Sequence, residues 1–368
     1  MRYRRMPIEI ESPEQYGFDL IDNNLSESSV SDMRLGDLSV QLDELVLAYG
    51  DHRGTPELRE LIAADDPPIG PDDVLVTVGA AGALYIVNSS LLSAGDHAVI
   101  EFPNYATNLE TPLAIGADLE RFELRYEDGW RLDPERLAAM IRPDTRFVSL
   151  TTPHNPTGAV IEEDDLRRIV GVVEASSSLL LVDETYREMS KQPAPLASTL
   201  SERAISVSGM SKSFGLPGIR VGWITCSNPD LMETFLAAKE QIGLSGSLVD
   251  EAIACAALRR KEPILAAIAE HVDANRALLK AWIDDRRDVE WVEPRAGVTG
   301  FVRIRDTMGV RVDVFHQVLL RELRTCVGPG HWFGFDDRYM RIGFGWPTTE
   351  RLAAGLEAIS EALRRAHA

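Results

Sequence analysis

The sequence predicts an α/β fold with a mostly parallel β-sheet, helices on both faces of that sheet, and a smaller second lobe. Short apolar segments rich in Val, Leu and Ile recur along the chain and alternate with segments of helical character. These strand-like segments are continuously apolar, which is typical of parallel strands buried on both faces. The chain has 368 residues. Because single cores stop growing at roughly 250–300 residues, two lobes are expected.

The expected strands follow a polar N-terminal arm that extends to about residue 40. In chain order they are VLVTV (74–78), HAVIEF (97–102), LERFEL (119–124), RFVSLTT (146–152), SLLLVDE (178–184), RAISVS (203–208) and RVGWITC (220–226). Helical candidates such as DPERLAAMI and EDDLRRIVGVVEA lie between several of them. This alternation is what places helices on both faces of a parallel sheet.

The pattern becomes long and helical from about 229 to 285, and a helix there would join two lobes. The remaining residues mix short strands with helices, which suits a smaller α+β lobe. We therefore expect an N-terminal arm (1–40) that contributes to the small domain, a large ligand-binding domain (41–275) and a small C-terminal domain (276–368).

Composition excludes several classes of function. The formal net charge is −20 and the sequence pI is about 4.8, so phosphate backbones and anionic lipids would be repelled. No apolar run is long enough to span a membrane, and the N-terminus lacks the apolar core of a secretory signal. The three cysteines are scattered and show no metal-ligand spacing. We expect a reducing cytoplasmic location, no bound metal, and no nucleic-acid or membrane partner.

The segment SVSGMSKSFGLPGIRVGW (206–223) carries the first chemical signal. Lys212 lies just after an expected strand, in a turn rich in Ser and Gly. A lysine amine forms Schiff bases with carbonyl compounds when burial or nearby positive charge lowers its pKa. Arg220 would bind a phosphate, and Ser208 and Ser211 offer hydroxyl groups. Taken alone, the segment also fits a surface turn with a solvated lysine.

The segment LLLVDETYREM (179–189) carries the second signal. Asp183 ends an apolar strand, where open α/β sheets bind their ligands. An aspartate beside a pyridine nitrogen keeps that nitrogen protonated, so the ring can take up electrons. Tyr186 would donate to a phenolic oxygen of the same ring. The alternative is an ordinary strand-end aspartate that caps a helix.

Three further turns follow expected strands. Asn155, between two prolines in TTPHNPTGAVI (151–161), would hydrogen-bond the ring oxygen. Gly79, Ala80 and Ala81 lie where a strand leads into a helix, and their backbone N–H groups would bind phosphate. Tyr105 in EFPNYAT would stack on the ring. Each segment also fits a simpler structure, namely a plain Pro-rich turn, a ligand-free turn of small residues, and a half-buried surface aromatic.

Together these segments resemble the class I/II aminotransferases of the fold-type-I superfamily, which depend on pyridoxal 5′-phosphate (PLP). The resemblance runs in order over roughly 45–345 and includes S-K-x-x-G-x-P-G-x-R-x-G, D-x-x-Y and P-x-N-P-T-G. It implies the fold-type-I PLP-transferase architecture and PLP as cofactor. By this resemblance Lys212, Asp183 and Tyr105 are catalytic. Lys212 forms the Schiff base, Asp183 pairs with the ring nitrogen, Tyr105 stacks on the ring, and Asn155 and Tyr186 hold the ring oxygen.

The resemblance also implies contacts for the phosphate, the substrate and a second subunit. Arg220, Ser211 and the backbone of 79–81 would hold the phosphate. Tyr49, in LAYGDHRGTPELRELI (47–62), would reach the cofactor phosphate of a partner subunit, which implies a homodimer with shared active sites. Arg341, in YMRIGFGWP, would bind the α-carboxylate of the substrate, with a geometry that suits a guanidinium group.

Some positions depart from the family pattern. Gly209 stands three residues before the lysine, where relatives often have a phosphate-binding Ser or Thr. The segment IDNNLSESSV (21–30) resembles the family's substrate-side loop only loosely, so Asn24 and Ser26 are candidate substrate contacts beside Asn155. GLPGIRVGW, PHNPTG and PRAGVTGF (294–301) are similar to the capreomycidine-synthase-like branch, which includes non-transaminating chemistry in specialised amino-acid metabolism.

The expected activity is that of an aminotransferase acting on an amino acid. The reaction would pass through an external aldimine and a Cα carbanion, with Lys212 as general base, and would yield a 2-oxo acid. One alternative keeps PLP but ends in β/γ-elimination, as in a C–S lyase, or in cyclisation, decarboxylation or oxidative deamination. Another alternative is a regulatory or scaffold module that retains the cofactor site without turnover.

Overall fold

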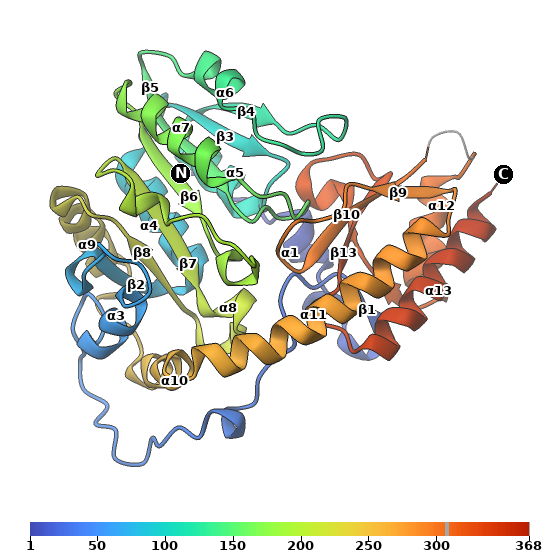
Figure 1. Ribbon diagram of the computed structural model, residues 1–368, viewed down its shortest axis with the longest axis horizontal. Helices are drawn as coiled ribbons and strands as arrows, with labels where there is room; N and C mark the ends of the chain where they lie inside the picture. Colours follow the sequence, from blue (N-terminus) through green and yellow to red (C-terminus); the bar gives the residue numbers. More distant parts are fainter. Residues whose placement is uncertain (306–308, 368) are drawn as a thin grey trace.

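The computed structural model describes residues 1–305 and 309–367, which contain two larger β-sheets that lie side by side (Figure 1) and a short two-stranded sheet. The larger sheet has the strand order β2-β8-β7-β6-β5-β3-β4. Its strands are β2 (Val74–Val78), β3 (His97–Phe102), β4 (Asp118–Glu123), β5 (Thr145–Thr151), β6 (Leu179–Asp183), β7 (Ala204–Gly209) and β8 (Val221–Thr225). Only β8 runs antiparallel to its neighbours. The expected mostly parallel α/β fold is therefore confirmed.

Helices cover both faces of this sheet, as the apolar strands require. Along β6, Leu181 packs into the core beneath α4 (Gly79–Leu91) and α9 (Pro229–Gly243), whereas Leu180 and Val182 pack toward α7 (Glu163–Glu174). Successive side chains of a strand point to opposite faces, so a strand between two cores has no polar face. The remaining helices near this sheet are α3 (Pro56–Ala63), α5 (Ala106–Ile115), α6 (Pro134–Met140), α8 (Met210–Ser213) and α10 (Leu248–Leu258).

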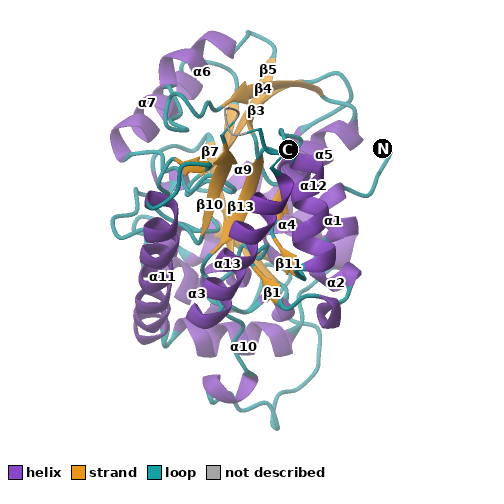
Figure 2. Cartoon of the chain, turned by 90° about the vertical axis from the view of Figure 1, so that its right-hand side faces the viewer, coloured by secondary structure: helices purple, strands orange, loops and turns teal. Residues whose placement is uncertain are grey.

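The smaller sheet is antiparallel and has the order β12-β13-β10-β9. Its strands are β9 (Val289–Trp291), β10 (Thr299–Ile304), β12 (Gly328–Pro329) and β13 (Tyr339–Gly343). The helices α11 (Lys261–Asp284), α12 (Val312–Gln317) and α13 (Thr349–Ala366) pack beside it around one apolar core (Figure 2). Figure 1 shows α11 running from α10, at the larger sheet, to α13. The expected long helical region is thus three helices, and α11 spans the expected boundary at residue 275.

The N-terminal segment lies between the two sheets. It contains α1 (Pro7–Glu11) and α2 (Pro13–Tyr16), and then β1 (Asn23–Asn24), which pairs in parallel with β11 (Thr325–Cys326). Residues far apart in the sequence are therefore joined, and the arm is placed against the C-terminal part of the chain.

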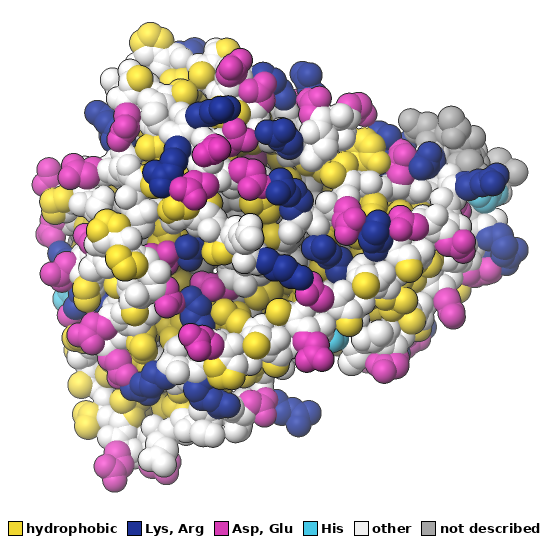
Figure 3. Space-filling view, in the orientation of Figure 1, with side chains coloured by type: hydrophobic (Ala, Val, Ile, Leu, Met, Phe, Trp, Pro, Cys, Tyr) yellow, Lys and Arg dark blue, Asp and Glu magenta, His cyan; other side chains and the backbone are white. Residues whose placement is uncertain are grey.

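The charged surface is mixed on the face seen in Figure 3. Lys and Arg side chains lie among Asp and Glu side chains and do not gather into one basic field. No helix within 1–305 or 309–367 has both the length and the apolar character needed to cross a membrane.

Candidate active site

The carboxyl ends of parallel strands meet at one edge of the larger sheet and form a cavity of about 450 Å³. Strands β2, β3, β5, β6 and β7 share one direction, so the residues that follow them converge on that edge. Sequence-predicted residues that line the cavity are Ala80, Ala81, Tyr105, Asn155, Asp183, Tyr186, Ser211, Lys212, Arg220 and Arg341. The topology brings together side chains that are up to 261 positions apart, from Ala80 to Arg341.

Lys212 lies on the short helix α8, directly after β7. Its Nζ donates a hydrogen bond to Ser28 Oγ at 3.1 Å. Burial lowers the pKa of the Lys212 amine, and the carboxylates of Glu27 and Glu14 only partly oppose this effect. A lowered pKa increases the neutral fraction of the amine, which is the form that attacks a carbonyl carbon or accepts a proton.

Asp183 is the last residue of β6 and is buried. Its Oδ1 accepts hydrogen bonds from the backbone N–H of Thr185 at 3.1 Å and from Thr185 Oγ1 at 2.5 Å. Burial raises the pKa of the Asp183 carboxyl group. Within the described part of the chain no lysine or arginine forms an ion pair with it. A protonated ring nitrogen in the cavity would supply the missing positive charge.

Arg341 lies on β13 of the smaller sheet and binds Asn155, which follows β5 of the larger sheet. Its Nη1 donates to Asn155 Oδ1 at 3.0 Å and its Nη2 donates to the carbonyl oxygen of Ser26 at 2.5 Å. Its Nε is buried and has no hydrogen-bond partner in the described structure. An unpaired buried N–H is costly, so this donor is suited to an anionic group of a ligand.

Tyr186 is buried at the same edge, and its hydroxyl group donates to the carbonyl oxygen of Ser28 at 2.8 Å. Burial raises the pKa of Tyr186, which keeps the phenol protonated as a donor. Tyr105 immediately precedes α5 and lines the cavity, and burial raises its pKa as well.

A cradle for a phosphate lies at the start of α4. Gly79 has a φ of +68°, and a Cβ at this position would lie 2.5 Å from Arg220 Nη2. The absence of a side chain at Gly79 leaves room for the Arg220 guanidinium to lie close to the backbone at the start of α4. Arg220 Nη1 also donates to Ser211 Oγ at 3.3 Å. Exposed N–H groups at a helix start, a guanidinium and a hydroxyl group form a binding site for phosphate.

A side chain at Gly209, where relatives often carry a hydroxyl group, would fit tightly against the neighbouring backbone. A Cβ at this position would lie 3.0 Å from the carbonyl oxygen of Val221 and 3.1 Å from Gly222 Cα. Ser208 also does not supply the missing contact, because its Oγ lies 3.5 Å from the carbonyl oxygen of Glu184 and the side chain does not line the cavity. The groups at this end that could bind a phosphate are Arg220, Ser211 and the backbone N–H groups at the start of α4.

Three residues of the predicted site, Gly79, Asn24 and Tyr49, do not line the cavity. Asn24 was expected to contact substrate, but its Oδ1 instead accepts from Ser26 N and Oγ at 3.1 and 2.8 Å, and its Nδ2 donates to Glu27. Asn24 thus shapes the turn that carries Ser26 into the cavity wall. Tyr49 is 85% exposed and does not line the cavity of its own chain.

Several lining residues could not be predicted from sequence motifs. Ser28 binds both Lys212 and Tyr186, yet it lies in a segment without a recognisable motif. The N-terminal arm also contributes to the wall, through Ile8, Glu9, Ser12, Pro13, Glu14 and Gln15. These contacts depend on how the arm folds back, which local patterns do not encode.

Comparisons with known proteins agree with this geometry. The sequence profile of the family described as "Aminotransferase class I and II" matches residues 25–359. The chain is 33% identical to capreomycidine synthase of Streptomyces vinaceus, over 92% of this chain and 89% of that protein. A PLP-dependent aminotransferase from Streptococcus suis has a TM-score of 0.92 at 28% identity and full coverage of both chains. The PLP-dependent cyclase OrfR has a TM-score of 0.88 at 28% identity, over 99% of this chain and 98% of that one.

Proposed function

The chain belongs to the class I and II aminotransferase family and is a PLP-dependent enzyme, and from this premise we propose that it transfers the amino group of an amino acid and releases a 2-oxo acid. The residues of the cavity fit the cofactor. Asp183 is a buried carboxylate without a cationic partner, and a side chain at Gly79 would fill the phosphate cradle. When bound, PLP supplies an electron-withdrawing ring that takes up the charge left when Cα loses its proton.

The observation that carries the proposal is that the buried Lys212 amine and the Arg341 guanidinium line one cavity, where burial lowers the pKa of the amine. Arg341 offers its unpaired Nε to the α-carboxylate, and Lys212 Nζ accepts the proton of Cα and later returns a proton. With PLP bound, the charge of Asp183 would hold a proton on the ring nitrogen. Tyr186 and Asn155 would orient the ring oxygen, while Arg220 and Ser211 would bind the phosphate.

Two measurements test this proposal. An aminotransferase releases one 2-oxo acid per active site when it is mixed with an amino acid alone, and turnover continues only after a second 2-oxo acid is added. Borohydride reduction of the loaded protein should attach the cofactor to the peptide that contains Lys212. A label on another peptide, or no label, would contradict the assignment of Lys212.

The similarity to the cyclase OrfR favours a second candidate, a PLP enzyme that does not transaminate. Cyclisation, β/γ-elimination, decarboxylation or oxidative deamination begin with the same proton removal at Cα or with loss of the carboxylate. Sustained turnover without any 2-oxo acid acceptor would identify this class. Release of ammonia or a thiol then indicates elimination, carbon dioxide indicates decarboxylation, and oxygen consumption indicates oxidation.

We also propose that the enzyme is a homodimer in a reducing, cytoplasmic setting. Val46, Leu47 and Tyr49 form an apolar stretch in which each residue is more than 70% exposed, as suits a contact with a second copy. Cys226 and Cys326 are free and buried, and burial raises the pKa of both thiols to about 11, which leaves little reactive thiolate.

A further inference from the structure

The wall of the active-site cavity formed by the N-terminal arm carries unpaired negative charge. Glu9 on α1 and Glu14 on α2 line the cavity. Neither carboxylate forms an ion pair or a side-chain hydrogen bond with any residue that the structure describes. The chain has 38 Lys and Arg residues, and several other acidic side chains form ion pairs with arginines.

The Lys and Arg side chains that line the same cavity contact groups other than Glu9 and Glu14. Arg220 belongs to the phosphate cradle, Lys212 Nζ is bonded to Ser28, and Arg341 is bonded to Asn155 and Ser26. None of these three neutralises Glu9 or Glu14 by a direct contact. The negative charge on the arm is therefore available to a ligand.

The arm is held in a defined place, so these carboxylates have a defined position. Glu11, between them, accepts a hydrogen bond from Trp332 Nε1 at 2.7 Å and lies 2.7 Å from His331 Nε2. Trp332 itself lines the cavity. Figure 1 shows α1 in the space between the larger sheet and the strands β10 and β13.

Two fixed points orient an amino acid in the cavity. The amine of Lys212 meets the α-carbon, and the unpaired Nε of Arg341, which is buried, provides independent evidence for an anionic group of a ligand. With the α-carboxylate at Arg341, the substrate side chain extends toward the rest of the lining, which includes the arm. Glu9 and Glu14 are exposed residues, so a cationic side chain would be attracted to their carboxylates, whereas a neutral side chain would gain no such attraction.

We propose that Glu9 and Glu14 are specificity-determining residues that select amino acids with a cationic side chain, either an ammonium or a guanidinium group. The proposal rests on the function proposed above, because it assumes that an amino acid reacts at Lys212. Glu27 is not assigned to this role, because its Oε1 already accepts from Asn24 Nδ2 at 3.2 Å.

Lysine and norleucine provide the test, since norleucine has the same four side-chain carbons and lacks the ammonium group. Arginine, compared with its neutral analogue citrulline, distinguishes a guanidinium from an ammonium preference. We expect kcat/KM for the better cationic substrate to exceed that of its neutral analogue by about tenfold or more in the wild-type enzyme. In the Glu9→Gln/Glu14→Gln variant this ratio should fall by about tenfold, mainly through KM. Each exposed charge pair contributes about 1.4- to 5-fold to affinity, and here two carboxylates act together.

The control variant is Glu262→Gln, which removes the same charge from an exposed position of α11 away from the cavity and should leave the ratio unchanged. A second readout does not need turnover, namely the affinities of lysine and norleucine for the Lys212→Ala protein, measured by calorimetry. Equal reactivity and equal affinity of cationic and neutral analogues would overturn the proposal while leaving transamination intact. Conversely, a cation preference in binding without release of any 2-oxo acid would support it and refute the proposed reaction.

Discussion

Asp183 and Lys212 show how one buried edge shifts two ionisable groups toward their neutral forms. Burial raises the pKa of the Asp183 carboxyl group and lowers the pKa of the Lys212 amine. For Lys212 the neutral form is the reactive one. For Asp183 the charged form is needed, and a cationic ring nitrogen that enters the cavity would restore it.

Asp183→Asn should lower the activity of the enzyme without lowering the stability of the fold. The amide keeps the side-chain shape and an acceptor for Thr185 but loses the negative charge. We expect kcat/KM to fall by about 10²–10³, the usual range for one electrostatic partner in an active site. The apo protein should unfold at the same or a higher temperature, because a buried carboxylate without a cation is unfavourable. A loss below about tenfold would mean that another group protonates the ring nitrogen.

Motifs in turns after strands predicted most of the residues at this edge, because strand direction alone brings those turns together. Asp183 ends a strand of the mostly parallel sheet, and Lys212 and Asn155 each follow one, so their convergence follows from the topology. Ser28 and Glu14 reach the cavity only because the arm folds back across the chain. Their placement depends on long-range packing of the arm, for which the sequence shows no periodic signal.

At the scale of elements, the arm is joined to the C-terminal part of the chain by a cluster with a titratable histidine. His331 Nδ1 lies 2.8 Å from Asp337 Oδ1, and its Nε2 lies 2.7 Å from Glu11 Oε2. The hydrogen bond with Asp337, supported by Glu11, raises the pKa of His331 to about 9. A protonated imidazole donates to both carboxylates at once, whereas a neutral imidazole donates to only one.

Attachment of the arm should therefore weaken at alkaline pH. The folded-state pKa of His331 is raised above its ordinary value of about 6.5, so the contribution is complete below about pH 6.5 and is lost as the pH rises through about 9. We expect proteolytic cleavage within residues 1–20 to accelerate between pH 8 and 10. In His331→Gln the rate should already be high at pH 8 and vary little with pH. An unchanged pH profile in that variant would show that another group controls the arm.

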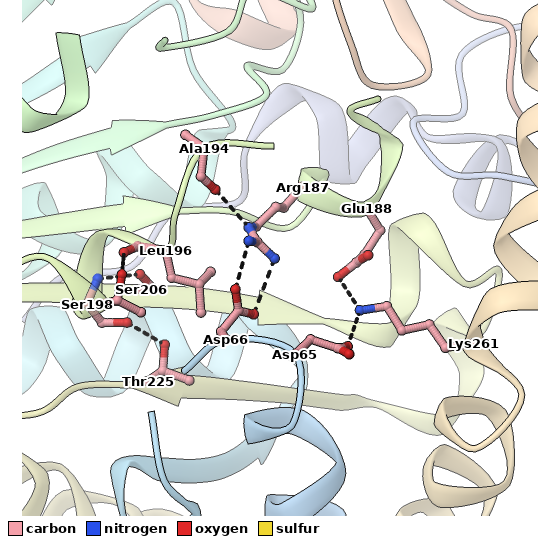
Figure 4. Close-up of polar contacts among 11 residues, drawn as sticks. Asp65, Asp66, Arg187, Glu188, Ala194, Leu196, Ser198, Ser206, Thr225 and Lys261 are labelled. Atoms are coloured by element: carbon pink, nitrogen blue, oxygen red, sulfur yellow. Dashed lines mark hydrogen bonds and ion pairs between the residues drawn. The ribbon is translucent and has the colours of Figure 1, made fainter. Parts of the chain in front are cut away.

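A second cluster of ion pairs fixes the segment that follows Tyr186 (Figure 4). Arg187 Nη2 and Nη1 donate to Asp66 at 2.7 and 3.3 Å, and Lys261, at the start of α11, pairs with Asp65 and Glu188. The side chains of Arg187 and Asp66 are only 17% and 13% exposed. Three elements that are distant in sequence thus meet beside the active-site strand β6.

Asp66→Ala should destabilise the protein by leaving Arg187 partly buried without its carboxylate. Loss of one partner of a buried charged pair typically costs about 1–3 kcal/mol. We expect a decrease of that size in the free energy of unfolding, measured with denaturant. Arg187→Ala combined with Asp66→Ala should cost less than the sum of the single changes. Additive effects would show that the two side chains do not interact in solution.

At the scale of the whole molecule, the two larger sheets and the arm form one cavity from segments spread between residues 8 and 341. The large and small domains expected from the sequence remain a prediction, with α11 continuous across the expected boundary at residue 275. Tyr49 takes no part in this cavity and is highly exposed. A role for Tyr49 in catalysis therefore requires a second copy of the chain.

Mixing two inactive variants tests this last point. In a dimer with shared sites, Tyr49→Ala impairs both sites of its own homodimer, and Lys212→Ala removes the amine from both sites of the other. A hybrid would contain one site with an intact Lys212 from the first chain and an intact Tyr49 from the second chain. We expect activity to reappear after the subunits are exchanged under mild denaturation and refolding, up to one functional site per hybrid dimer. Each variant treated alone is the control. If Tyr49 acted only within its own chain, the hybrid would have no intact site and the mixture would stay inactive.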